Sequence, residues 1–278
     1  MSTLFITPVA HAHTTDKGML FTDVPASTPN LQEIMVLQSV GLIGYNGVDM
    51  ALNVTENLSR KDFAGWVGGF FKLEGSTVDD HAQSALKEEY VSSLDGDITY
   101  KEINRALFHQ KLELENPDAT LTKEEYIQFI TANVDADMGE HSLLQMGGFS
   151  YGPTGIIEDV VTGDNTGLII DGQTYMLSGH PRVFADSTEP KSWVGQTLEQ
   201  SILTTNGGSH DHGNSHEEAV TGNVLQYIQL SQATQDSAEA PKDSSDAEKT
   251  TLIKPSLLIG SIILLGVLLG MMMWKRKK

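Results

Sequence analysis

The sequence predicts a multidomain protein in which an all-α module precedes a small β-barrel or sandwich module, a disordered tether and a single C-terminal transmembrane helix. Three observations predict this order. Apolar residues recur at helical spacing over 20–142, short β-rich runs between turn residues fill 152–230, and an uncharged apolar run occupies 257–274. The chain therefore divides where its composition changes.

The first twelve residues predict a truncated signal peptide. Residues 4–10 are apolar and run into Ala10-His-Ala12, a small-x-small pattern that is typical of cleavage sites. The basic residues that usually precede such a run are absent, and the run is short, so a disordered tail is the alternative. With a signal peptide, the bulk of the chain would be exported.

The helical domain, residues 20–142, is predicted from an apolar stripe and from repeated helix starts. Leu31, Ile34 and Leu37 recur at helical spacing, and Gly41 ends that helix. A further helix is predicted over 80–94. Three other starts place a Ser or Thr three residues before an acid, which is the capping box: Ser59 with Asp62, Thr99 with Glu102, and Thr122 with Glu125.

One stretch of about fifty residues, 21–72, resembles a repeat of the S-layer homology (SLH) family. The resemblance rests on Phe21-Thr-Asp-Val-Pro25, Gly41-Leu-Ile-Gly44 and Leu58-Ser-Arg-Lys-Asp-Phe-Ala64, which follow one another in the family's order. Residues 80–112 and 113–134 resemble degenerate repeats, because Tyr100 and Lys123 stand where the family has an arginine.

The family resemblance implies a helical repeat that docks on cell-wall polysaccharide. Its helix-start motif matches Ser59, Arg60, Lys61 and Asp62, and the resemblance implies that these residues bind an acidic glycan, with Arg60 in contact with it. The alternative is a helical module in which the same residues only cap helices and no ligand binds.

Residues 95–102 also resemble the second half of an EF-hand calcium loop, with an acid, a glycine and a terminal Glu102. The first half does not fit, because Val91 stands where the leading aspartate is needed. Helix capping is therefore the favoured interpretation of this segment.

The β domain, residues 152–230, is predicted from short runs of β-forming residues bounded by Gly, Asp and Asn. Asp171-Gly172 predicts a two-residue hairpin turn. The strands are expected over 156–161, 168–170, 173–177, 193–204 and 220–230. Gly148-Phe-Ser-Tyr-Gly152 matches the hydrolase Gly-x-Ser-x-Gly rule, but Pro153 and a strand follow it, so a junction loop is expected. No complete catalytic motif is present, and we expect no enzyme.

The segment 207–218 carries the densest set of metal-ligating residues. His210, His212 and His216 lie close to Asp211 and Glu217. Imidazoles on one loop can converge on Zn²⁺, Ni²⁺ or Cu²⁺, and carboxylates can complete the shell. The alternative is a solvated hairpin loop that binds no metal.

The C-terminal segments predict a tether and an anchor. Residues 231–254 are rich in Ser, Asp, Ala and Glu and predict a disordered acidic linker. Residues 255–278 predict a transmembrane helix with a basic cytoplasmic tail, which would place the bulk of the chain outside the cell. A formal net charge of −19 argues against nucleic acid as a partner, and the absence of cysteine excludes disulfides.

Together these features predict a single-pass cell-membrane protein whose extracellular part binds cell-wall polymer or a surface protein and acts as a scaffold. The alternative is an extracytoplasmic protein that captures divalent ions with the histidine loop and delivers them to a membrane partner. No cofactor other than such an ion is expected.

Overall fold

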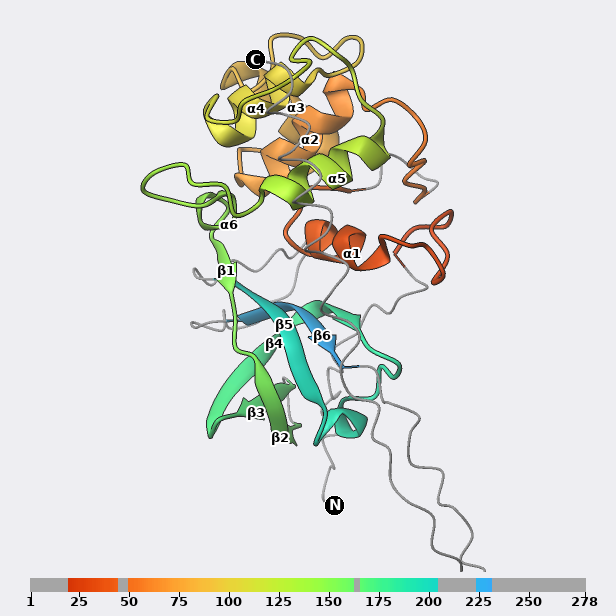
Figure 1. The fold of residues 1–278 in the computed structure, drawn as a ribbon, viewed down its shortest axis with the longest axis vertical. Helices are drawn as coiled ribbons and strands as arrows, with labels where there is room; N and C mark the ends of the chain where they lie inside the picture. Colours follow the sequence, from red (N-terminus) through yellow and green to blue (C-terminus); the bar gives the residue numbers. More distant parts are fainter. Residues whose placement is uncertain (1–19, 45–49, 163–165, 205–223, 232–278) are drawn as a thin grey trace, which may run out of the picture. The chain divides into compact units, whose positions relative to one another are not determined.

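The computed structural model describes residues 20–44, 50–162, 166–204 and 224–231 (Figure 1). Its contacts divide the chain into Met1–Thr234 and Gln235–Lys278, and the second unit lies wholly outside the described residues. Helices come first and strands follow: α1 (Leu31–Ser39), α2 (Arg60–Phe70), α3 (Val78–Lys87), α4 (Tyr100–Phe108), α5 (Lys123–Asn133), α6 (Leu143–Met146), β1 (Phe149–Tyr151), β2 (Gly155–Val161), β3 (Gly167–Ile170), β4 (Gln173–Phe184), η1 (Pro190–Trp193), β5 (Thr197–Thr204) and β6 (Val224–Leu230).

The predicted fold class is wrong in its transmembrane helix. The structure combines helices with a six-stranded sheet, and within the described ranges no helix is long and apolar enough to cross a membrane. The longest described helices, α2 and α5, have 11 residues each, or roughly 16 Å, which is about half of a bilayer's hydrocarbon core. The structure therefore gives no support to the predicted anchor. Residues 255–278 lie outside the described residues, as do 1–12 and 232–254.

Helix starts follow the predicted chemistry in α4 and α5. Thr99 and Thr122 each accept the N3 amide, and Glu102 and Glu125 each accept the N-cap amide in return, so both capping boxes are confirmed. The helix predicted over 80–94 starts earlier and ends sooner. Thr77 and Asp80 form its capping box, and α3 ends at Lys87 because Glu89 takes a left-handed conformation with φ of 63°.

The starts of α2, α4 and α5 close into a ring of backbone hydrogen bonds, which we call the helix-start ring (residues 56–60, 96–100 and 119–123). The first residue of each helix donates its N–H to the carbonyl three residues before the N-cap of the next. The three bonds are Arg60 to Gly96 at 2.9 Å, Tyr100 to Ala119 at 3.2 Å and Lys123 to Glu56 at 2.9 Å. The residue before each N-cap, Leu58, Ile98 or Leu121, is buried.

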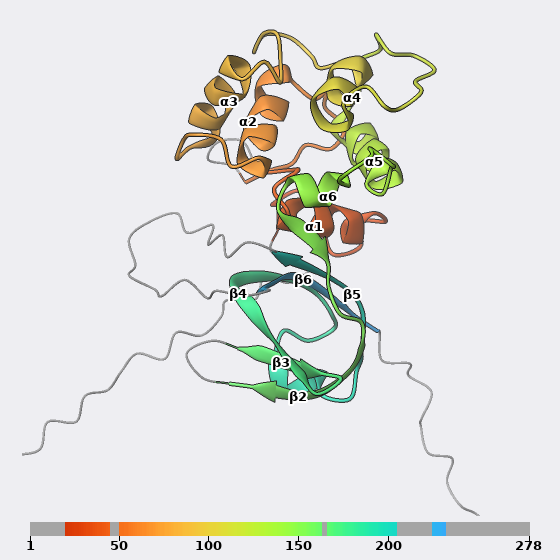
Figure 2. The ribbon, with the colours of Figure 1, turned by 90° about the vertical axis from the view of Figure 1, so that its left-hand side faces the viewer.

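The strands pair into a closed circle, visible in Figures 1 and 2. β5 pairs with β2, β2 with β3, β3 with β4, β4 with β6, and β6 with β5, with a parallel register between β4 and β6 alone in this list. The Asp171-Gly172 turn is confirmed, because both residues have positive φ, as a type I′ hairpin requires. The junction loop expected at 148–152 contains β1, which pairs with β5 and buries Phe149.

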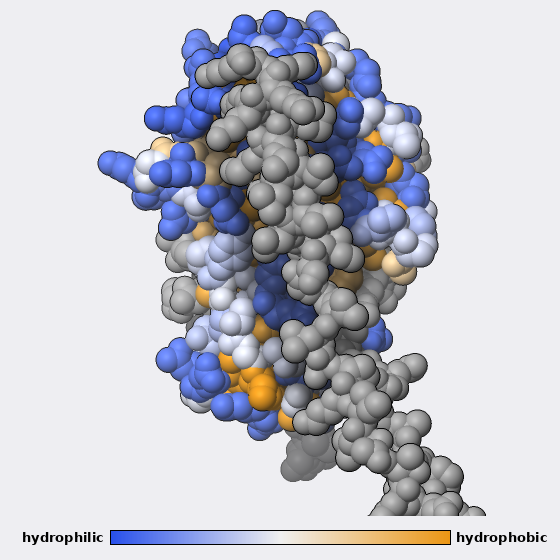
Figure 3. All heavy atoms as spheres, viewed as in Figure 1, coloured by the Kyte–Doolittle hydropathy of each residue, from blue (hydrophilic) through white to orange (hydrophobic). Residues whose placement is uncertain are grey.

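Two hydrophobic clusters form the core. One contains the buried residues of the helical part, from Leu20 to Leu144, together with Phe149, Ile202 and Tyr227. The other contains buried residues of the strands and Trp193. α1 also contacts β6 through Gln32, whose Nε2 donates to Gln229 Oε1 at 2.6 Å. On the face in Figure 3, hydrophilic residues dominate the helical part, and hydrophobic ones gather where β2 and β3 lie in Figure 1.

Candidate functional site

Ser59 and Asp62, two of the four predicted glycan-binding residues, hold the start of α2. The Ser59 hydroxyl accepts the Asp62 N–H at 3.0 Å. The Asp62 carboxylate does not return to the Ser59 amide, so this capping box is half formed. Asp62 Oδ2 instead lies 3.8 Å from Nζ of Lys123. Both residues therefore serve the fold at this position.

Arg60 is held by Glu102, 42 residues further along the chain. Its Nε donates to Glu102 Oε1 at 2.8 Å and its Nη2 to Oε2 at 3.2 Å, while Nη1 donates to the Asp95 carbonyl at 2.7 Å. The side chains of Arg60 and Glu102 are 24% and 14% exposed. Such a bidentate pair fixes the orientation of the guanidinium.

The electrostatics agree with this geometry. Burial alone would raise the pKa of Glu102, but hydrogen bonds from Arg60 and Thr99 outweigh it, so the pKa of Glu102 is lowered. The hydrogen bond to Glu102 raises the pKa of Arg60. The positive charge of Arg60 therefore stabilises the helix-start ring. The family resemblance implies instead that this charge contacts a glycan.

Lys61 differs from Arg60 because its side chain is 53% exposed. Its Nζ lies 2.9 Å from Asp79 Oδ1, whose side chain is also exposed. An ion pair of this kind is screened by solvent and adds little stability. Lys61 can therefore exchange Asp79 for a ligand at small cost.

In the helix-start ring, the first residues of α5 and α4 occupy the position that Arg60 occupies in α2. Lys123 stands at the position of Arg60, and its Nζ donates to the Leu52 carbonyl at 2.9 Å, with Asp62 and Glu56 nearby. Tyr100 stands at the third position, where burial raises its pKa and the charge of Glu125 raises it further. The two residues that interrupt the arginine pattern therefore occupy equivalent positions, each as the first residue of its helix.

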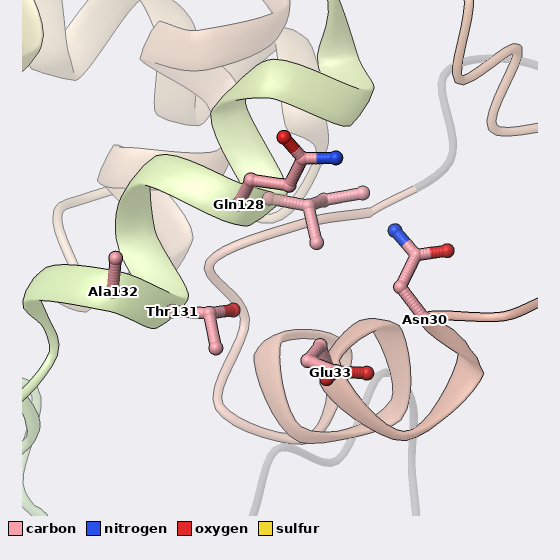
Figure 4. A pocket seen from close by; sticks show the side chains of 6 residues that line it. Asn30, Glu33, Gln128, Thr131 and Ala132 are labelled. Carbon is pink, nitrogen blue, oxygen red and sulfur yellow. The ribbon is translucent and has the colours of Figure 1, made fainter. Parts of the chain in front are cut away.

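A groove of about 270 Å³ lies between α1 and α5 (Figure 4). Asn30 and Glu33 come from the start of α1, and the other side chains come from α5. The lining residues are Asn30, Glu33, Ile127, Gln128, Thr131 and Ala132. Ile127 is buried and supplies an apolar floor, while Gln128, Thr131 and Ala132 are exposed.

A comparison with the helix pair α2 and α3 shows which residues of the sequence produce the groove. Gly65 and Gly68 stand six and nine residues after the N-cap of α2. A Cβ there would lie 2.5 Å from Val78 Cγ1 and 2.5 Å from the His81 carbonyl oxygen, so α3 packs directly against the glycines. The equivalent positions of α5 are Gln128 and Thr131. Their side chains keep α1 at a distance, and a groove remains.

The polar groups of the groove are available to a ligand. Asn30 precedes α1 but does not cap it with its side chain. Among the described residues, the side chains of Glu33, Gln128 and Thr131 form no hydrogen bond or ion pair with one another or with their neighbours. Sequence reasoning missed this site, because polar residues on one helix face are also typical of a solvated face.

The predicted metal ligands His210, His212, His216, Asp211 and Glu217 lie outside the described residues. Within the ranges that the structure describes, no group of three or more His, Asp or Glu side chains could hold a metal ion. In the segment 95–102, the Glu102 carboxylate is engaged by Arg60 and Thr99, which agrees with capping.

Comparisons of the chain with protein-family models, with curated proteins and with solved structures find no match. The resemblance to the S-layer homology family therefore stays a prediction.

Proposed function

We propose that the chain is a non-covalent binding protein whose helical part holds a hydroxyl-rich polymer, such as cell-wall polysaccharide, in the groove between α1 and α5. The groove carries this proposal, because amide, hydroxyl and carboxylate groups that have no partner among the described residues border a mostly apolar surface. Ligand sites combine these features, usually with volumes of roughly 300–1,000 Å³. About 270 Å³ suits a short segment of a longer chain.

Exposed Lys61 is a second proposed contact, and the resemblance of 21–72 to a polysaccharide-docking repeat supports the same function. Arg60 acts in this proposal as a positioning residue, because Glu102 and the Asp95 carbonyl hold its guanidinium. A surface protein that presents hydroxyl and amide groups is the alternative occupant of the groove.

Filling the groove tests the proposal. Ala132→Trp places an indole among the lining residues, and we expect the protein to lose most of its sedimentation with purified cell walls. Ala26→Trp is the control, because Ala26 is exposed and lies outside both the groove and the helix-start ring. Equal sedimentation of both variants, with matching circular dichroism spectra, would remove the groove from the function.

We also propose metal capture by the histidine segment as a second function. β5 and β6 place Thr204 opposite Val224, so the segment 205–223 starts and ends at the same place on the sheet. Calorimetric titration of Zn²⁺, Ni²⁺ and Cu²⁺ checks this. We expect the binding heat to disappear when His210, His212 and His216 are replaced with Ala. A heat unchanged by the three replacements contradicts metal capture.

A further inference from the structure

Glu33 is the charged side chain among the six that line the groove. No cation comes from α1, whose sequence is LQEIMVLQS. The basic residue of α5, Lys123, is 6% exposed, and its Nζ donates to the Leu52 carbonyl. The two helices therefore offer a ligand in the groove a negative charge and no free positive one.

The described strands supply no cation that forms an ion pair with Glu33. Tyr227 of β6 is buried, and its hydroxyl has no hydrogen-bond partner among the described residues. Burial raises the pKa of Tyr227, and the charges of Glu33 and Glu199 raise it further. Among the described residues, no cation forms an ion pair with Glu33.

The remaining polar groups suit a ligand that both donates and accepts hydrogen bonds. Asn30 and Gln128 each carry an amide with two N–H donors and a carbonyl acceptor, and Thr131 adds a hydroxyl. A carboxylate beside amide oxygens accepts all the hydrogen bonds of an ammonium group. An acidic ligand would meet the repulsion of Glu33, and none of the six described lining residues is a cation that could offset it.

We propose that the groove selects a polymer segment carrying a primary ammonium group beside hydroxyls, such as an amino sugar without its N-acetyl group, and that Glu33 pairs with the ammonium. This inference rests on the proposed function of the groove. It reverses the charge of the ligand that the family resemblance implies, because Arg60 is engaged by Glu102 and the one charged residue that lines the groove is Glu33.

Three soluble hexamers test the inference with the full chain: β-1,4-linked glucosamine, its N-acetylated form, and galacturonic acid. At low ionic strength we expect the glucosamine hexamer to bind about two- to fivefold tighter than the N-acetylated one, as a partly exposed ion pair provides. The galacturonate hexamer should bind most weakly. Added salt should reduce the preference for the amine.

Glu33→Gln keeps the shape of the side chain and removes its charge, so we expect it to lose most of the preference for the glucosamine hexamer over the N-acetylated one. Glu124→Gln is the matched control, because it changes the net charge equally at an exposed position of α5 outside the groove. It should keep the wild-type preference.

The outcomes separate the inference from the proposed function. If the wild-type protein binds both glucosamine-based hexamers equally, or if Glu124→Gln loses the preference as Glu33→Gln does, the charge selection is refuted and the groove function stands. If no hexamer binds and Ala132→Trp still sediments with cell walls, the groove function fails, and the inference fails with it.

Discussion

Arg60 and Glu102 illustrate what a sequence motif can predict at the scale of a single residue. The capping pattern located the N-cap residues of α2, α4 and α5 correctly, because that pattern depends on neighbours within one turn. The partner of Arg60 could not be predicted, because it lies on another helix start. A cation that looks free in the sequence is a bidentate ion-pair partner in the fold.

Glu102→Gln tests the structural role of this pair. We expect the free energy of unfolding at neutral pH to fall by about 1–3 kcal/mol, because charge-assisted hydrogen bonds are lost. The pKa of Glu102 is lowered in the folded state. Its stabilisation is therefore complete above the ordinary glutamate pKa and is lost as the pH falls through the lowered value.

Urea unfolding at successively lower pH measures this effect. The wild-type protein should lose more stability on acidification than Glu102→Gln, and Glu124→Gln should follow the wild-type curve. Parallel curves for wild type and Glu102→Gln would show that the carboxylate contributes nothing through its ionisation.

At the scale of elements, small residues decide which helices meet closely. Gly68 of α2 lets the backbone of α3 approach, whereas Thr131 at the equivalent position of α5 leaves the groove. The start of α3 was predictable from Thr77 and Asp80, which form a capping box that the apolar pattern of 80–94 obscured. The contrast between the two helix pairs required the structure, because it depends on which helices are neighbours.

Neighbouring glycines of α2 provide a matched test of this packing. A Cβ at Gly68 would lie 2.5 Å from the His81 carbonyl oxygen, whereas a Cβ at Gly69 meets nothing within 4 Å. We expect Gly68→Ala to lower the free energy of unfolding by about 1–3 kcal/mol through overpacking. Gly69→Ala should raise it by about 0.5–1 kcal/mol, because alanine favours the helix.

Thermal and urea unfolding of the two variants measure the difference. Opposite signs are expected for substitutions one residue apart. A gain in stability for Gly68→Ala would mean that α3 does not pack against this face of α2.

At the scale of the whole molecule, features that depend on neighbouring residues could be predicted from the sequence, and pairings between distant segments could not. The hairpin at Asp171-Gly172 was predictable because its turn chemistry is local. The parallel pairing of β4 with β6 was not predictable, because the residue pattern of a strand does not specify which distant strand it pairs with. β1 was missed because three residues give no measurable alternation, although Phe149 is fully buried. The groove was missed because its two walls, on α1 and α5, are far apart in the chain.

The helix-start ring also constrains the order of events during synthesis. The carbonyl of Glu56 receives its ring hydrogen bond from Lys123, so the start of α2 is incomplete until the start of α5 is available. The start of α2 leaves the ribosome before the start of α5, so it cannot form this hydrogen bond until α5 has been synthesised. We therefore expect the helical part to acquire its native contacts late in translation, in one step rather than one repeat at a time.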